Sequence, residues 1–271
     1  MIASGSWNET TRESRAVQHS GFAGFLSGSA RLSDRVIVGG VVALLGDDKV
    51  SDASQRGLGF GVGGHIDMAL LTFDRSLIDL RLDVAHTRAT YDFKRGVGFD
   101  NVQIGSGNTS LDSTGVGATF RYDYAYTDTT VVGPYLGVYY EHIHRGAYTE
   151  GENMDTAVSF DALTENAVVA RVGLRGAHEW LNGFILRGGV GADIDLHVDD
   201  AKVTGTSVLM SATTFTFDTD QDRNNVRGNA LLILEYALSE RQRVEWGSRV
   251  ETPSFADDWA ALTGIRYSLL F

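Results

Sequence analysis

The stretch Trp259-Ala-Ala-Leu-Thr-Gly-Ile-Arg-Tyr-Ser-Leu-Leu-Phe271 decides the fold class of this 271-residue chain. Side chains of a β-strand point alternately to its two faces, so every second residue shares a face. One face is almost wholly apolar with an aromatic at each end: Trp259, Ala261, Thr263, Ile265, Tyr267, Leu269 and Phe271. The other face mixes Arg, Ser and Gly with apolar residues. This pattern is typical of a strand with lipid on one side and aromatic side chains at both membrane interfaces.

The composition disfavours several other classes of protein. The longest apolar stretch, Val36 to Leu45, falls short of the roughly 18 consecutive apolar residues that a transmembrane helix needs. The net charge of −12 disfavours a nucleic-acid partner. The absence of cysteine suits an oxidising compartment. Because no signal peptide opens the sequence, we expect Met1 to begin a mature chain or a piece cut from a longer protein.

The alternation recurs along the whole chain, and the connections between strands fall into two classes. Tight turns are expected at Ser33-Asp34, Asp74-Arg75, Asp128-Thr129, Asn182-Gly183 and Ser239-Glu240. Long polar connections are expected at Asp47–Gly57, Lys94–Ser113, Arg145–Leu163 and Val198–Val226. Short turns on one side and long loops on the other are typical of outer-membrane β-barrels, whose long loops lie outside the cell.

The sequence therefore predicts an all-β fold: a transmembrane, antiparallel, up-and-down β-barrel of about 12 strands in a single domain, residues 1–271. If the last strand ends at the periplasmic side, the strand Val17–Leu32 runs inward and Ile2–Asn8 must supply an earlier strand. Pro134 cannot donate to a strand ladder, so we place it near the periplasmic start of its strand. The competing fold is a soluble antiparallel sandwich, which would need the apolar face to be buried.

Charged residues occupy the face opposite the apolar one. Between Ile78 and Val84, aliphatic residues alternate with charges, as in a wall with lipid outside and water inside. The inward face collects nine charges of this kind: Asp79, Arg81, Asp83, Arg121, Glu141, Arg171, Arg187, Glu245 and Arg249. They either pair across the lumen and stabilise the wall, or contact a polypeptide that passes through the lumen or resides there.

No catalytic, metal or cofactor site is predicted. His142 and His144 share a strand face near the outer rim at a spacing that could chelate a metal, but no third ligand stands nearby in the sequence. Asp218–Asp222 is similar to a calcium loop, yet the glycine and the closing glutamate of such a loop are missing. We therefore expect solvated histidines, an ordinary acidic loop and no enzyme activity.

Several stretches together resemble the translocator (β) domain of autotransporters, the type V secretion proteins. They match an early hairpin, a middle Pro-aromatic strand, a Thr-Glu element, a Gly-Leu-Arg element and a C-terminal strand of that family: Leu32–Val41, Gly133–His142, Tyr148–Glu150, Ala170–Arg175 and Thr263–Phe271. Their order and spacing extend over most of the chain. The resemblance implies an outer-membrane location in a Gram-negative bacterium and a role in secretion.

In that family the barrel exports or anchors an N-terminal passenger, and a linker helix commonly runs through the pore. Both would precede residue 1. The expected partners are outer-membrane lipid, the barrel-assembly machinery and the chain's own passenger, with the barrel a monomer. The alternative function is a free-standing, porin-like channel, whose full-length gene would be barely longer than this chain.

The resemblance also assigns an assembly signal to the last strand. The barrel-assembly machinery would recognise Gly264, Tyr267, Leu269 and Phe271, and Leu269 stands where the family usually has an aromatic residue.

Overall fold

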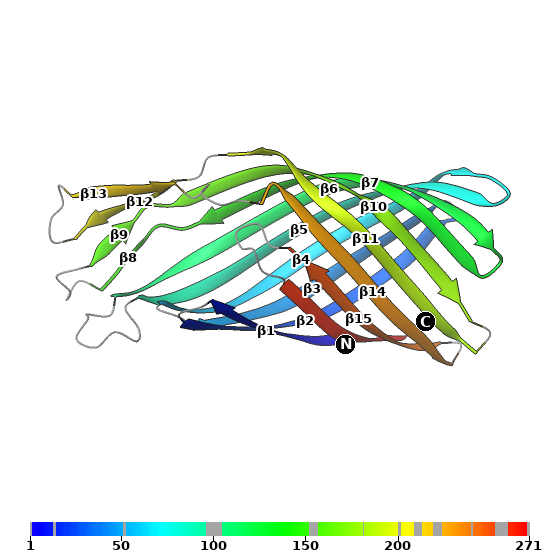
Figure 1. The fold of residues 1–271 in the computed structure, drawn as a ribbon, viewed down its shortest axis with the longest axis horizontal. Helices are drawn as coiled ribbons and strands as arrows, with labels where there is room; N and C mark the ends of the chain where they lie inside the picture. Colours follow the sequence, from blue (N-terminus) through cyan, green and yellow to red (C-terminus); the bar gives the residue numbers. More distant parts are fainter. Residues whose placement is uncertain are drawn as a thin grey trace.

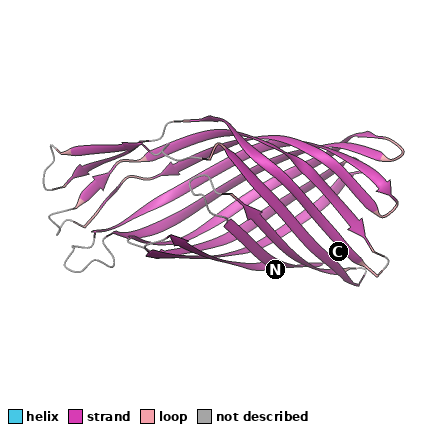
Figure 2. Ribbon diagram, viewed as in Figure 1, coloured by secondary structure: helices cyan, strands magenta, loops and turns pink. Residues whose placement is uncertain are grey.

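The structure is a computed structural model that describes residues 2–12, 15–50, 53–95, 105–151, 157–180, 182–199, 202–208, 213–218, 224–239, 241–252 and 260–269. The regular elements in these residues are all β-strands (Figure 2). Over the same residues, no helix is long and apolar enough to cross a membrane.

Twelve of the described strands form a closed antiparallel barrel (Figure 1). They are β1 (Ile2–Arg12), β2 (Arg15–Ser33), β3 (Val36–Val50), β4 (Ala53–Thr72), β5 (Ser76–Arg95), β6 (Gly105–Thr127), β7 (Thr130–Arg145), β10 (Leu163–Glu179), β11 (Phe184–Val198), β14 (Val226–Ser239), β15 (Gln242–Glu251) and β16 (Ala260–Leu269). Each strand pairs with the next one along the wall, and β16 pairs back with β1. The predicted fold class and strand number are confirmed, including the early strand at Ile2–Asn8.

The ring closes through a short seam. Strands β1 and β16 are joined by three described residue pairs, which centre on Ser4 and Gly264. By contrast, β1 and β2 share eleven pairs, from Ile2 with Phe25 to Arg12 with Arg15. Because the number of ladder hydrogen bonds grows with the number of residue pairs, the β1–β16 seam is the weakest joint in the described wall.

Short turns gather at one end of the barrel, on the right in Figure 1. At the turn between β10 and β11, Gly183 adopts a φ of 83°, a conformation that a residue without Cβ reaches at no steric cost. The first turn lies at Asp34-Arg35, one residue later than predicted, because Ser33 still belongs to β2. Leu269 pairs with Gln242 beside a short turn, so the described end of β16 lies at this end, as predicted.

The long connections are shorter than the sequence predicted, and this is a correction. Strands β3 and β4 pair out to Val50 with Ser54, inside the expected loop Asp47–Gly57. Likewise β6 already begins at Gly105, inside the expected loop Lys94–Ser113. These extensions are polar on both faces, so they carry no alternation of apolar and polar residues to mark them as strand.

The other two long connections contain a second, four-stranded sheet in the order β13-β12-β9-β8. It consists of β8 (Tyr148–Thr149), β9 (Val158–Phe160), β12 (Lys202–Ser207) and β13 (Thr214–Asp218), at the left in Figure 1. The rings of Phe93, Tyr148 and Phe160 stack in sequence with centroid distances of 5.6 and 4.9 Å. This stack joins the sheet to β5 of the barrel wall.

Pro134 lies on the fifth residue of β7, near its short-turn end, as predicted. It pairs with Leu174 on β10, but on the β6 side the described ladder is interrupted between Tyr135 and Val132. Proline has no backbone N–H to donate, so the interruption is the expected consequence.

Candidate functional site

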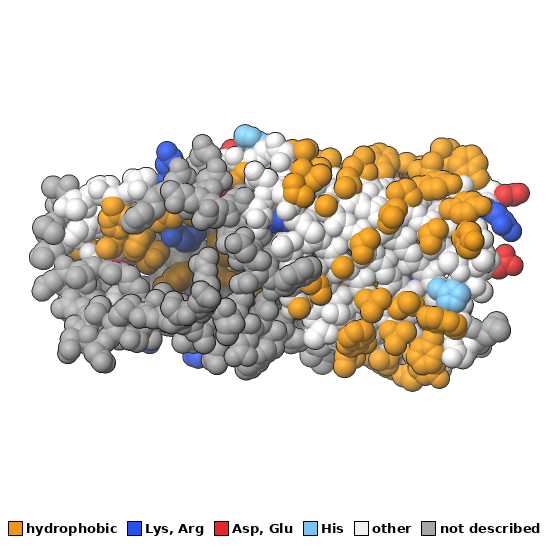
Figure 3. All heavy atoms as spheres, viewed as in Figure 1, with side chains coloured by type: hydrophobic (Ala, Val, Ile, Leu, Met, Phe, Trp, Pro, Cys, Tyr) orange, Lys and Arg blue, Asp and Glu red, His pale blue; other side chains and the backbone are white. Residues whose placement is uncertain are grey.

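The outer face of the barrel is apolar and exposed. Leu44 is 64% exposed and Leu174 is 60% exposed, although both would be buried in the core of a soluble sandwich. Among the described residues, the fully buried apolar side chains are Ala157, Ala167 and Val169. In Figure 3, apolar side chains spread over the half of the molecule that carries the short turns. The exposed apolar surface rules out the sandwich and requires a lipid environment.

The height of this apolar belt matches a membrane. On β7 the outward residues are apolar from Val132 to Tyr140 and become polar at His142. Nine residues at about 3.4 Å each span about 31 Å along the strand. A strand tilt of about 40° reduces this to about 23 Å along the membrane normal, close to the roughly 25 Å belt of outer-membrane barrels.

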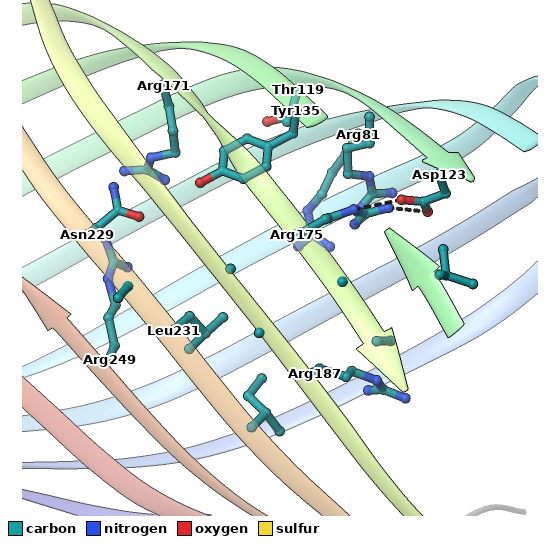
Figure 4. A pocket seen from close by; sticks show the side chains of 18 of the residues that line it. Arg81, Thr119, Asp123, Tyr135, Arg171, Arg175, Arg187, Asn229, Leu231 and Arg249 are labelled. Atoms are coloured by element: carbon teal, nitrogen blue, oxygen red, sulfur yellow. Dashed lines mark hydrogen bonds and ion pairs between the residues drawn. The ribbon is translucent and has the colours of Figure 1, made fainter. Parts of the chain in front are cut away.

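The inward face surrounds a cavity of about 600 Å³. Its lining comes from seven barrel strands, and arginine is the commonest charged residue in it: Arg81, Arg121, Arg171, Arg175, Arg187 and Arg249. Figure 4 shows five of these arginines, which come from β5, β10, β11 and β15, around the cavity. Five of the nine charges predicted to face inward belong to this lining.

Each of these arginines has an acidic partner. On the wall formed by β4, β5 and β6, Arg121 binds both Asp79 and Asp67. Asp79 is 6% exposed, and Arg175 lies 3.6 Å from it. Arg175 also donates from Nε to Asp123 at 3.0 Å, the contact drawn in Figure 4. Such a network balances buried charges that would otherwise be costly to desolvate.

On the opposite wall, Glu235 is held between two arginines. Its carboxylate lies 2.9 Å from Arg187 and 2.6 Å from Arg243, and the residue is 1% exposed. Between the two walls, Arg171 binds both carboxylate oxygens of Asp193 at 2.6 Å. This bidentate geometry fixes the guanidinium plane as well as its charge.

The remaining predicted residues lie near the same space. Asp83 accepts a hydrogen bond of 2.8 Å from Arg81. Glu141 lines a smaller neighbouring cavity together with Arg171 and Arg249. Glu245 lies 3.7 Å from Arg266 and lines a third cavity. All nine side chains therefore lie at cavities or within the ion pairs around them.

Two tyrosines of β7 partly fill the cavity. Tyr139 hydrogen-bonds Thr119 at 2.5 Å, and the Arg171 guanidinium lies 4.7 Å above its ring. The Tyr139 ring lies flat over Gly117 of the neighbouring strand, where a Cβ would overlap it. Glycine on β6 thus lets an aromatic side chain lie along the wall rather than across the lumen.

The site prediction omitted Asp67, Asp123, Arg175, Asp193 and Glu235, which complete the charge network. The sequence did indicate that each of these side chains faces inward, because each lies on the inward-facing positions of its strand. It did not indicate which charges pair, because Arg175 and its partner Asp123 are 52 positions apart.

The two histidines considered as metal ligands have hydrogen-bond partners in the barrel wall. His142 and His144 hydrogen-bond Asn166 and Thr164 through Nδ1. Of the acidic stretch Asp218–Asp222, residues 219–222 lie outside the described residues.

The proposed assembly signal is described in part. Tyr267 is 41% and Leu269 is 44% exposed on the outward face of β16. Gly264 occupies an inward-facing position of the same strand and pairs with Ser4 of β1. Phe271 lies outside the described residues.

Comparison with known proteins adds the family. The autotransporter β-domain family model matches residues 2–245, and no curated protein sequence matches the chain. The structure is similar to the translocator domain of autotransporter NalP from Neisseria meningitidis, with a TM-score of 0.74, 13% identity and coverage of 100% of this chain and 85% of that one.

Two other solved structures share the fold. The β domain of the Bordetella autotransporter BrkA gives a TM-score of 0.58 at 14% identity, covering 100% of this chain and 98% of that one. The transport unit of autotransporter AIDA-I from Escherichia coli gives 0.56 at 12% identity, covering 100% and 89%. The match of the family model over most of the sequence carries the assignment, and the folds agree with it. The chain belongs to the autotransporter β-domain family, the Gram-negative outer-membrane translocators that export a passenger by type V secretion.

Proposed function

We propose that the passenger of this translocator passes through the lumen in contact with the paired charges that line it. The observation that carries the proposal is the arginine-lined cavity inside a twelve-stranded wall. Guanidinium groups already paired with carboxylates keep further N–H donors for water or for peptide carbonyl groups. A lining with both signs of charge can therefore hydrogen-bond a moving chain without holding it by apolar contact.

The size of the barrel sets what can pass. About eight strands enclose an interior that side chains fill, whereas about 16 leave an open aqueous channel. Twelve strands lie between these limits and suit a single helix or an extended segment rather than a folded domain. We infer that a linker upstream of residue 1 occupies the lumen, and that residues 1–271 act as one domain.

We further propose the remaining partners. The exposed belt contacts outer-membrane lipid, and the closed ring suits a monomer because β1 and β16 cover each other's edges. The barrel-assembly machinery recognises Gly264, Tyr267, Leu269 and Phe271. The barrel acts by passage and anchoring, without enzymatic catalysis.

The test of passage uses two adjacent leucines. Leu231 lines the cavity and Leu232 lies on the opposite face of β14, while both are 44% exposed. A photo-crosslinking amino acid is placed at either position in a barrel that carries a passenger stalled during export. We expect a crosslink to the passenger from position 231 and none from position 232.

Two outcomes would count against the proposal. A passenger that reaches the surface with no crosslink at position 231, or with equal crosslinks at both, does not pass along this lining. A barrel that inserts normally but leaves every upstream passenger in the periplasm is better explained as a channel. In planar bilayers, the barrel without its linker should conduct ions, and adding the natural upstream segment should lower that conductance.

A further inference from the structure

On four neighbouring strands of the outer face, the apolar belt ends at the same row of paired residues. The last apolar row consists of Val84, Val116, Tyr140 and Val168. The next row toward the long-loop end consists of His86, Thr114, His142 and Asn166. The row after that consists of Arg88, Asp112, His144 and Thr164. Because the long loops are extracellular in this family, these two polar rows lie at the headgroups of the outer leaflet.

The three histidines of these rows are held in the same way. Each is hydrogen-bonded through Nδ1 to a neighbour on the next strand: His86 to Thr114 at 2.9 Å, His142 to Asn166 at 2.7 Å and His144 to Thr164 at 3.0 Å. Within the described part of the chain, Nε2 of each ring has no partner. The wall thus fixes three imidazoles and leaves the nitrogen farther from the backbone available to a ligand.

The hydrogen bonds of Asn166 determine the protonation of His142. The Asn166 amide nitrogen donates to Asp199 at 2.5 Å, so its oxygen accepts from Tyr140 and from His142, each at 2.7 Å. Nδ1 of His142 must therefore carry a proton. In the neutral ring Nε2 is then an acceptor, and it becomes a donor only when the imidazole is charged. By contrast, the hydroxyl partners of His86 and His144 can donate to Nδ1, which leaves an Nε2 donor in the neutral ring.

Charged side chains flank the three imidazoles. Arg88 is more than half exposed and lies 3.6 Å from Asp112. On the far side, Asp199 lies 3.2 Å from His197. The hydrogen bond from Asn166 lowers the pKa of the Asp199 carboxyl, so this group stays ionised through the range in which histidines titrate.

We infer that this polar edge, formed by His86, Arg88, His142 and His144, binds the phosphate groups of outer-leaflet glycolipid headgroups. Phosphate offers several acceptor oxygens, and three Nε2 groups with one guanidinium supply donors at the height where those headgroups lie. Acyl chains of the same lipid would lie along the apolar belt directly below. Nε2 of His142 joins these donors when its imidazole is charged. The inference needs only the outer-membrane location and is independent of how the passenger travels.

The test measures lipid retained by the purified barrel in detergent, counted by native mass spectrometry. The probes are bisphosphorylated lipid A, the same lipid after removal of its phosphates, and inorganic phosphate. At about pH 5.5 we expect lipid A to bind about fivefold more tightly to the wild-type barrel than to His142→Gln or to Arg88→Gln, a modest difference because the groups are partly exposed.

His178 provides the matched control, since its Nδ1 bonds Thr130 at 2.8 Å and so holds the same kind of wall contact beside a short turn. His178→Gln should leave retention unchanged. The inference is overturned if His178→Gln weakens binding as much as His142→Gln, or if the dephosphorylated lipid binds as tightly as lipid A. Equal binding of inorganic phosphate would mean a free-anion site rather than a lipid site. Unchanged circular dichroism and heat-modified mobility establish that each variant is folded.

Discussion

Leu232→Arg and Leu231→Arg place the same charge on opposite faces of β14 at equal starting exposure. Leu232 stands seven residues before the end of its strand at Ser239. At about 3.4 Å per residue and a tilt of about 40°, it lies about 18 Å above the short-turn end, near the middle of the apolar belt. An arginine facing lipid near the midplane costs roughly 2–4 kcal/mol. An arginine in the lumen stays hydrated and should cost less than about 1 kcal/mol.

The assay is reversible unfolding of both variants in phospholipid vesicles, followed by tryptophan fluorescence against urea concentration. The wild-type chain supplies the reference for the free energy of unfolding. We expect Leu232→Arg to lose about 3 kcal/mol and Leu231→Arg to stay close to wild type. Equal losses, or a larger loss at position 231, would mean that the assignment of faces is wrong and that the cavity is not the aqueous side.

Three further predictions address the interior and the C-terminal strand. Asp79→Ala should cost about 3 kcal/mol of unfolding free energy, because it leaves two arginines without their shared buried partner. Asp83 is more exposed, so Asp83→Ala should cost less, and a smaller loss for Asp79→Ala than for Asp83→Ala would refute the network. Gly117→Val should displace the ring above it and cost about 1–3 kcal/mol, measured in the same way, and no loss would show that the ring has room. Deleting Phe271, or changing Tyr267 to Asp, should lower membrane insertion in cells while refolding in detergent continues; normal insertion in cells would contradict the assembly signal.

Much of the wall could be predicted because lipid restricts every second residue of a membrane-spanning strand to apolar side chains. Wherever a strand crosses the membrane its outward residues must be apolar, so the segment from Ile78 to Val84 was identifiable by alternation alone. The rule fails above the membrane, where β6 near Gly105 is polar on both faces and no alternation of apolar and polar residues remains. The short strands β8, β9, β12 and β13 were missed for the same reason, and they are too brief to show a period.

Inside the barrel, the sequence gives the direction of a side chain but not its partner. Parity places Arg121 on the inward face, yet its depth relative to Asp67 depends on how the tilted strands are staggered around the ring. That stagger follows from the register of every preceding pair. Charge pairing therefore required the assembled wall.

The most direct test of the closed barrel is a disulfide across its weakest seam. Ser4 pairs with Gly264, and opposed residues of an antiparallel pair have Cα atoms roughly 4.5–5.5 Å apart, within the reach of a disulfide. Because the chain contains no cysteine of its own, Ser4→Cys with Gly264→Cys gives a single possible bond. A control pair, Ser4→Cys with Ser268→Cys, is offset by four residues, about 14 Å along the strand.

The account predicts that the first pair forms an intramolecular disulfide in the outer membrane, seen as a reductant-sensitive shift in electrophoretic mobility of the denatured chain, and that the control pair stays reduced. Free thiols in the first pair, or disulfides between separate chains only, would contradict a wall closed by β1 and β16.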